Sequence, residues 1–274
     1  MREFFHAVFN VPVSEGSLVQ FVSEMAAAAT SPSEAIRQRV AQASCLGSDE
    51  TGLRVKQHQA WVWTWQTPTE TFLGVSPSRG SKAVTTFSPQ GFPHAVRVHD
   101  RWRAQRNTPA RSHQLCLAHV LRDLQYGVAV SRRALAWRLQ QVLRKAIALA
   151  TRMAPDSPHR PNACGHLEQT LDHLLAQCPP AHHREGGRLL KALRKHRDKL
   201  FVFLTEPNVP PTTNAREQAL RNSNVKQHVS MSFRTWHGAK PFVKLRTILD
   251  TCLKRKRDIF SVFQLMGEVC LSSE

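Results

Sequence analysis

The sequence lacks a long hydrophobic run, a secretory leader and any pair of cysteines of the C-x-x-C type. No apolar stretch approaches the roughly 18 residues that a membrane-spanning helix needs, so the sequence argues against a membrane protein. The opening segment, MREFFHAVFNVPVSEG, has no apolar core behind a basic start. The six cysteines are scattered over 274 residues. We therefore expect a cytoplasmic protein with reduced thiols.

Acidic residues are also scarce in this chain. Asp and Glu number 20 against 38 Lys and Arg, which gives a formal net charge of +18. Such an excess of one sign describes the partners of a protein rather than its fold. A generally basic, soluble surface or a ribosome-associated protein would account for it. We favour nucleic-acid binding, because a phosphate backbone releases counterions when Lys and Arg neutralise it.

The hydrophobic pattern changes along the chain and predicts an α/β protein in four parts. Residues 1–44 carry apolar side chains at helical spacing and are expected to form a helical segment. Residues 45–130 contain three successive strand patterns, a short fourth strand and then an amphipathic helix over 113–129. Residues 131–205 are basic and mostly helical, with Pro-containing breaks. Residues 206–274 begin with a Pro-rich loop and continue as helices.

Three acidic residues stand where a fold could bring them together. Asp49 and Asp100 each end a short apolar run typical of a strand, and Glu217 lies in the first turn of a predicted helix. Three converging carboxylates are a natural cage for Mg²⁺ or Mn²⁺. Two such ions bridged by acids suit in-line attack on a phosphodiester. In so basic a chain, the pattern predicts metal-dependent chemistry on DNA or RNA.

Each of these residues also has an ordinary structural interpretation. Asp49 could stabilise a turn in SDETG, and Asp100 could be a strand-end residue paired with a neighbouring arginine. Glu217 could close a capping box, because Asn214 as N-cap would put it at the third helical position. Glu50 competes with Asp49, since alternation along a strand lets only one of the two face the site. The spacing leaves these alternatives open.

Several segments carry distinctive motifs in a fixed order. They are SDETGLRV, VRVHDRW, HQLCLAHVLRDL and PPTTNAREQALRNSNVKQHVSMSFRTWHGAKPFVKLRTILDTCLKRKRDIFSVF. Together they resemble the catalytic core of a bacterial DDE transposase of the insertion-sequence family numbered sixty-six. The resemblance runs from about residue 3 to residue 266. Its most specific part is N-x-x-E-x-x-x-R, followed by a V-K-Q stretch and S-F-R-x-x-x-G-A. The chain departs from the family at Gln218, where Arg is usual, and after Asp100, where a Gly and an aromatic are usual.

This resemblance implies a ribonuclease H-like fold, in which helices flank a mixed sheet and a helical insertion precedes the last catalytic helix. It maps the catalytic, metal-binding carboxylates onto Asp49, Asp100 and Glu217, with Mg²⁺ or Mn²⁺ as cofactor. It implies strand cleavage and joining at transposon ends. The expected partners are double-stranded DNA, accessory proteins of the same element and further copies of the chain, in association with the nucleoid.

Relatives of this family carry an upstream region with a leucine zipper, metal-binding cysteines and a DNA-binding module. We therefore expect the chain to represent the catalytic core and C-terminal part without the N-terminal DNA-binding region. One alternative function is that of a truncated, catalytically inactive, transposase-derived DNA-binding protein. Another is a ribonuclease H-like nuclease that acts on hybrids or junctions.

Basic residues supply candidates for contact with nucleic acid. Those near the carboxylates or downstream of them are Arg221, Lys226, Arg234 and Lys240. Basic amphipathic helices are predicted at 132–145 and 188–199. These helices could present solvated faces or could contact phosphates without reading sequence.

A further motif, H-x-x-C-x-x-H, raises the question of zinc. It comprises His113, Cys116 and His119. On the predicted helix these three positions would not converge, and a fourth ligand is not evident. The resembling family carries a C-x-x-H pair at this point. We therefore expect Cys116 and His119 to pack or hydrogen-bond near Asp100.

Overall fold

The computed structural model describes all residues except 1, 132–133, 178–183, 207, 214–232 and 272–274. The chain divides into two compact units, and strand β1 contributes to both. The first unit comprises Met1–Ala43, Asp49–Pro89 and Gln218–Glu274, and the second comprises Ser44–Ser48 and Gln90–Glu217. In the described part of the chain, no helix combines the length and the apolar character needed to cross a membrane.

The described strands form a mixed five-stranded sheet in the order β3-β2-β1-β4-β5. Strands β2 (His58–Gln66) and β3 (Thr71–Ser76) are antiparallel. Strand β4 (Phe92–His99) runs parallel both to β1 (Cys45–Val55) and to β5 (Ala110–Leu115). Helices flank this sheet, so the predicted α/β, ribonuclease H-like class is confirmed.

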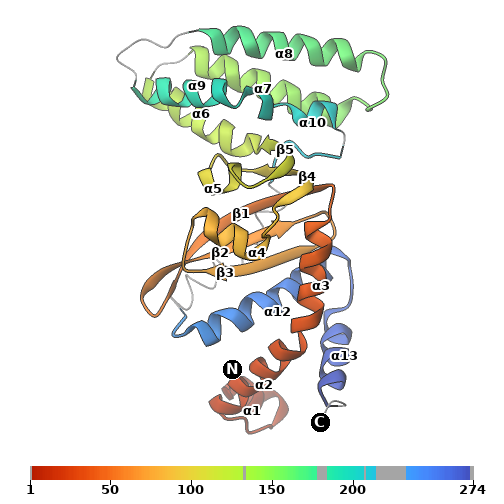
Figure 1. Cartoon of the computed structure of the whole chain (residues 1–274). Helices are drawn as coiled ribbons and strands as arrows, with labels where there is room; N and C mark the ends of the chain where they lie inside the picture. Colours follow the sequence, from red (N-terminus) through yellow and green to blue (C-terminus); the bar gives the residue numbers. More distant parts are fainter. Residues whose placement is uncertain (1, 132–133, 178–183, 207, 214–232, 272–274) are drawn as a thin grey trace. The chain divides into compact units, whose positions relative to one another are not determined.

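In the first unit, helix α12 (Trp236–Lys254) lies along the edge strand β3 and hydrogen-bonds to its backbone (Figure 1). Thr71 N donates to Thr251 Oγ1 at 3.1 Å, and Leu73 N donates to Thr247 Oγ1 at 3.0 Å. The two threonines are four residues apart and therefore share one helix face. Their spacing matches that of alternate residues on the strand. The helix thus satisfies an edge that would otherwise offer its N–H groups to another chain.

The other described helices of the first unit come before α12 and after it in the sequence. They are α1 (Arg2–Phe9), α2 (Glu15–Ala28), α3 (Thr30–Ala41), α4 (Ser81–Phe87) and α13 (Ile259–Leu271). Helix α2 packs on α12 and α13, while α3 packs on α12 and β3. On β2, Trp63 and Trp65 are buried and stack with their ring centroids 6.0 Å apart. These tryptophans therefore build the core of this unit.

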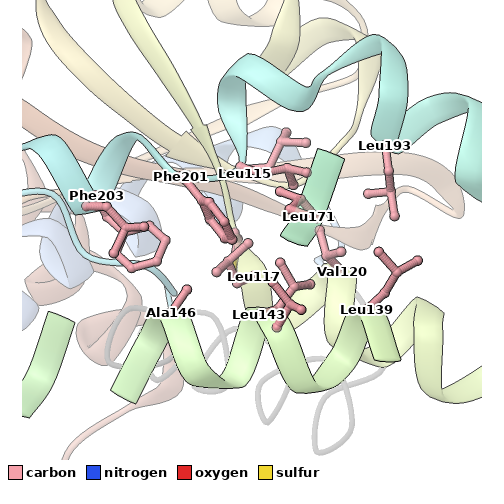
Figure 2. Packing of buried hydrophobic residues seen from close by; sticks show 14 of the residues in the cluster. Leu115, Leu117, Val120, Leu139, Leu143, Ala146, Leu171, Leu193, Phe201 and Phe203 are labelled. Carbon is pink, nitrogen blue, oxygen red and sulfur yellow. The ribbon is translucent and has the colours of Figure 1, made fainter. Parts of the chain in front are cut away.

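The second unit is dominated by a helical layer next to β5 (Figure 1). Its helices are α5 (Arg103–Arg106), α6 (Leu117–Ser131), α7 (Ala134–Arg152), α8 (Arg160–Ala176), α9 (Arg184–Lys195), the 3₁₀ helix η1 (Arg197–Lys199) and α10 (Val202–Thr205). Figure 2 shows the buried cluster that holds this layer together, with Leu139, Leu143 and Ala146 of α7 facing it. These positions recur at i, i+4 and i+7, which is the spacing of one helix face.

Residues 110–115 form strand β5, although the sequence pattern predicted a helix from residue 113. The error came from HQLCLAHVL, whose apolar spacing also fits a helix. Contacts with residues distant in sequence make this segment a strand. Strand β5 pairs with β4, and Gln114 in β5 donates to the Leu200 carbonyl at 3.0 Å while accepting from Phe203 N at 3.1 Å. Leu115, the last residue of this strand, is buried.

Candidate active site

Two of the predicted carboxylate residues closely follow the paired positions of β1 and β4 in the sequence. Gly47 pairs with Val98 in the parallel ladder. Asp49 follows Gly47 by two residues, and Asp100 follows Val98 by two residues. Asp100 comes directly after β4 ends, as predicted. Asp49 lies within β1, which continues to Val55, so the prediction that the strand ends there was wrong.

A buried arginine joins the segments that precede and follow these residues. Arg97, in the middle of β4, has no solvent exposure. Its guanidinium donates to Ser48 Oγ at 2.7 Å and to the Gln105 carbonyl at 2.8 Å. The Ser48 hydroxyl in turn donates to Gln105 Oε1 at 2.6 Å. Because a buried charge needs such partners, this network locks the start of β1, β4 and helix α5 into one arrangement within the second unit.

Asp49 and its neighbour Glu50 have different surroundings. The Glu50 side chain is fully buried and forms an ion pair with Arg79 at 2.9 Å. The Arg79 guanidinium also lies over the Trp61 ring, 4.8 Å from its centroid. Asp49 is only partly buried, and its Oδ1 accepts from Glu50 N at 2.9 Å. Glu50 is therefore engaged in holding β1 to the segment of Arg79, which leaves Asp49 as the candidate ligand.

Asp100 is oriented by the turn that follows β4. Its Oδ1 accepts from Trp102 N at 2.8 Å, and the residue is partly buried. Arg101, one of the pairing partners considered from sequence, forms an ion pair with Asp123 of α6. The carboxylate of Asp100 is thus fixed by a local backbone N–H, which is an Asx-type turn.

His99 directly precedes Asp100 and contacts His113, and burial favours the neutral form of both histidines. Burial, followed by the charge of Arg97, holds the pKa of His99 well below its ordinary value. Burial likewise lowers the pKa of His113 to about 4. His99 Nδ1 lies against the Asp100 carbonyl, and His99 Nε2 is 2.9 Å from His113 Nδ1. Because a carbonyl only accepts, His99 donates from Nδ1 and accepts from His113 at Nε2. A chain of hydrogen bonds therefore runs from His113 in β5 through His99 in β4 to the carbonyl of Asp100.

The prediction that the H-x-x-C-x-x-H motif lies on one helix was wrong. His113 lies on β5, Cys116 joins the strand to α6, and His119 lies in the first turn of α6. Among the residues that the structure describes, no three or more His, Cys, Asp or Glu side chains form a group able to hold a metal ion. Cys116 and His119 do hydrogen-bond to each other, as expected from the family pattern.

The remaining predicted site residues divide into two groups. Glu217, Arg221 and Lys226 lie outside the described residues. Arg234 and Lys240 are exposed in the first unit, just before and within α12. Lys240 lines a pocket formed by α2 and α12.

Sequence reasoning missed the network around Arg97. The available signal was an arginine in the middle of the apolar strand AVRVH, where a charge has to be satisfied by buried oxygens. The partners of Arg97 could not be found from sequence, because Ser48 lies 49 residues away on another strand.

A family model matches most of the chain. The family model described as Transposase IS66 family matches residues 1–241 of the 274. The matched range includes Asp49, Asp100 and Glu217. No curated protein matches the chain.

Proposed function

The chain belongs to the Transposase IS66 family, and on this premise we propose that it cleaves and joins DNA strands at transposon ends. The observation that carries the proposal is the β1–β4 register. Gly47 pairs with Val98 in this parallel ladder, and Asp49 and Asp100 each follow their member of the pair by two residues in the sequence, which supports the proposal. We propose Glu217, which lies outside the described residues, as the third carboxylate.

The donor chemistry of these residues fits Mg²⁺ or Mn²⁺, because carboxylate oxygens are the ligands that such hard ions prefer. In both aspartates a backbone N–H is donated to Oδ1, which orients the carboxylate before any ion binds. When bound, the ions would activate the attacking water or 3′-hydroxyl and neutralise charge on the leaving oxygen. Asp49, Asp100 and Glu217 would act as ligands and not as general acids.

The surrounding residues support this role. The Arg97 network links the start of β1 to helix α5, which follows Asp100 in the sequence. His99 and His113 are neutral, so they add no positive charge that would oppose a cation beside Asp100. Glu50 is neutralised by Arg79 and does not compete for the ion.

Helix α7 supports the proposal that double-stranded DNA is the partner. Its sequence, ALAWRLQQVLRKAIALATR, contains no acidic residue. Arg138, Arg144, Lys145 and Arg152 are all exposed on it. We propose that these side chains contact phosphates of the duplex without reading its sequence. Arg221, Lys226, Arg234 and Lys240 remain proposed DNA contacts.

DNA affinity should fall steeply as salt is raised, because each neutralised phosphate releases counterions. The double variant Arg144→Ala with Lys145→Ala should weaken binding to all duplexes and flatten the slope of log K against log salt by about 1 to 2 units. The matched control is Arg111→Ala, because Glu206 already neutralises Arg111. Titration of a labelled duplex by anisotropy at several salt concentrations measures the slopes. An equal change in the control variant, or a flat wild-type slope, would count against phosphate contact by α7.

The test of the proposed function is cleavage of a supercoiled plasmid that carries the ends of the element. Nicked and joined products should form with Mg²⁺ or Mn²⁺ and should disappear when EDTA is added. Binding to the plasmid without cleavage in either metal would favour the alternative, a transposase-derived DNA-binding protein. Preferential cleavage of RNA–DNA hybrids or junctions would favour a nuclease.

A further inference from the structure

Cys116 occupies the junction between β5 and α6, where its backbone meets the end of β4. The residue has no solvent exposure. Cys116 N donates to the His99 carbonyl at 2.7 Å. That carbonyl belongs to the residue directly before Asp100. The start of α6 is therefore attached to the strand end that presents the candidate ligand.

The thiol of Cys116 meets a second segment, which leads toward Glu217 in the sequence. Thr213 N donates to Cys116 Sγ at 3.3 Å, and the Thr213 hydroxyl lies 3.1 Å from the same sulfur. Next to it, Leu117 N donates to the Pro211 carbonyl at 2.9 Å. Thr213 is buried. Residues 211–213 are thus fixed at the same junction by three polar contacts.

The polar surroundings of the sulfur agree with a role as hydrogen-bond acceptor. Burial raises the pKa of the Cys116 thiol, but hydrogen bonding by His119 and Thr213 outweighs it, so that the pKa lies below its ordinary value. A sulfur that only filled space in an apolar core would not show these partners. A structural zinc role has no support in the described residues, because no group of three ligand-type side chains forms there.

We propose that Cys116 is a positioning residue that ties the end of β4, beside Asp100, to the 211–213 segment, four residues before Glu217. Its backbone N–H holds one segment and its sulfur holds the other. This inference rests on the proposed function, in which the carboxylates at 100 and 217 act together. A small displacement of either segment would move a metal ligand away from its productive position.

The experiment compares Cys116→Ala, which removes the acceptor, with Cys116→Ser, which keeps a shorter one. Cys252→Ala is the matched control, because Cys252 is also buried but lies on α12 in the first unit. The first readout is hydrogen exchange of the Thr213 amide in the protein free of metal and DNA. Exchange should accelerate about tenfold in Cys116→Ala, change by less than about threefold in Cys116→Ser, and stay unchanged in Cys252→Ala.

The second readout is DNA cleavage. Cys116→Ala should lower the cleavage rate by about 10- to 100-fold at unchanged DNA affinity, and Cys116→Ser should recover most of it. If Cys116→Ala does not fold, Thr213→Val removes the hydroxyl from the other side of the contact and should slow cleavage several-fold. Unchanged Thr213 exchange in Cys116→Ala, or equal losses in the Ser and Ala variants, would overturn the proposal. If the wild type cleaves no DNA, the proposed function fails, whereas the exchange measurement still decides whether Cys116 holds the segment.

Discussion

Replacing Asp49 with Asn is expected to lower metal-dependent DNA cleavage by about a thousandfold or more, a loss of about 4 kcal/mol of transition-state stabilisation. The amide keeps the shape of the carboxylate and can still accept from Glu50 N, so the fold should be retained. The rate of cleavage should fall, because an uncharged amide is a weak ligand for Mg²⁺. Cleavage of plasmid DNA in Mg²⁺, with thermal unfolding of the same preparation, measures the two effects separately.

The adjacent carboxylate provides a matched control with the opposite expectation. Glu50→Gln removes the charge that is paired with Arg79 at 2.9 Å, and Glu50 is fully buried. We expect a stability loss of about 1.5 kcal/mol, because a charge-assisted hydrogen bond is replaced by a weaker one. Cleavage per folded molecule should stay near that of the wild type. Loss of cleavage in Glu50→Gln with activity retained in Asp49→Asn would reverse the assignment of the two residues.

Truncation of the core of the second unit should have the largest effect on stability. Leu143 of α7 is 1% exposed and lies in the cluster shown in Figure 2. We expect Leu143→Ala to lower the free energy of unfolding by about 3 kcal/mol, through lost burial and the cavity left behind. Trp137, on the same helix, is 55% exposed, and Trp137→Ala should cost less than about 0.5 kcal/mol.

Urea denaturation followed by circular dichroism measures both free energies. The comparison is informative because Trp is the larger side chain, so size alone would predict the opposite order. Equal decreases in the free energy of unfolding in the two variants would mean that the face of α7 bearing Leu143 does not pack in the core.

Local patterns were sufficient where neighbours in sequence determine the structure. The three successive strand patterns predicted after residue 45 correspond to β1, β2 and β3. The apolar run before Asp100 identified β4. The same reasoning failed at 110–115, because HQLCL fits a helix equally well and only pairing with β4 makes it a strand.

The environment of the candidate site could be predicted only in part. Sequence named Asp49 and Asp100 and the competitor Glu50, and alternation along the strand predicts that only one of the two neighbours faces the site. The ion pair between Glu50 and Arg79 could not be predicted, because the two residues are 29 positions apart in the sequence. The contact between Cys116 and Thr213 could not be predicted either, because these residues are 97 positions apart. Such contacts depend on how strands and helices meet and not on local spacing.

Asp100→Cys provides the most direct test of the account, because it changes the metal preference of the site instead of only removing a ligand. A thiolate is a softer ligand than a carboxylate and binds Mn²⁺ more readily than Mg²⁺. We predict that Asp100→Cys leaves the plasmid intact in Mg²⁺ and regains cleavage in Mn²⁺, whereas the wild type cleaves in both. Undiminished cleavage by Asp100→Cys in Mg²⁺ would contradict the claim that the residue at position 100 holds the metal.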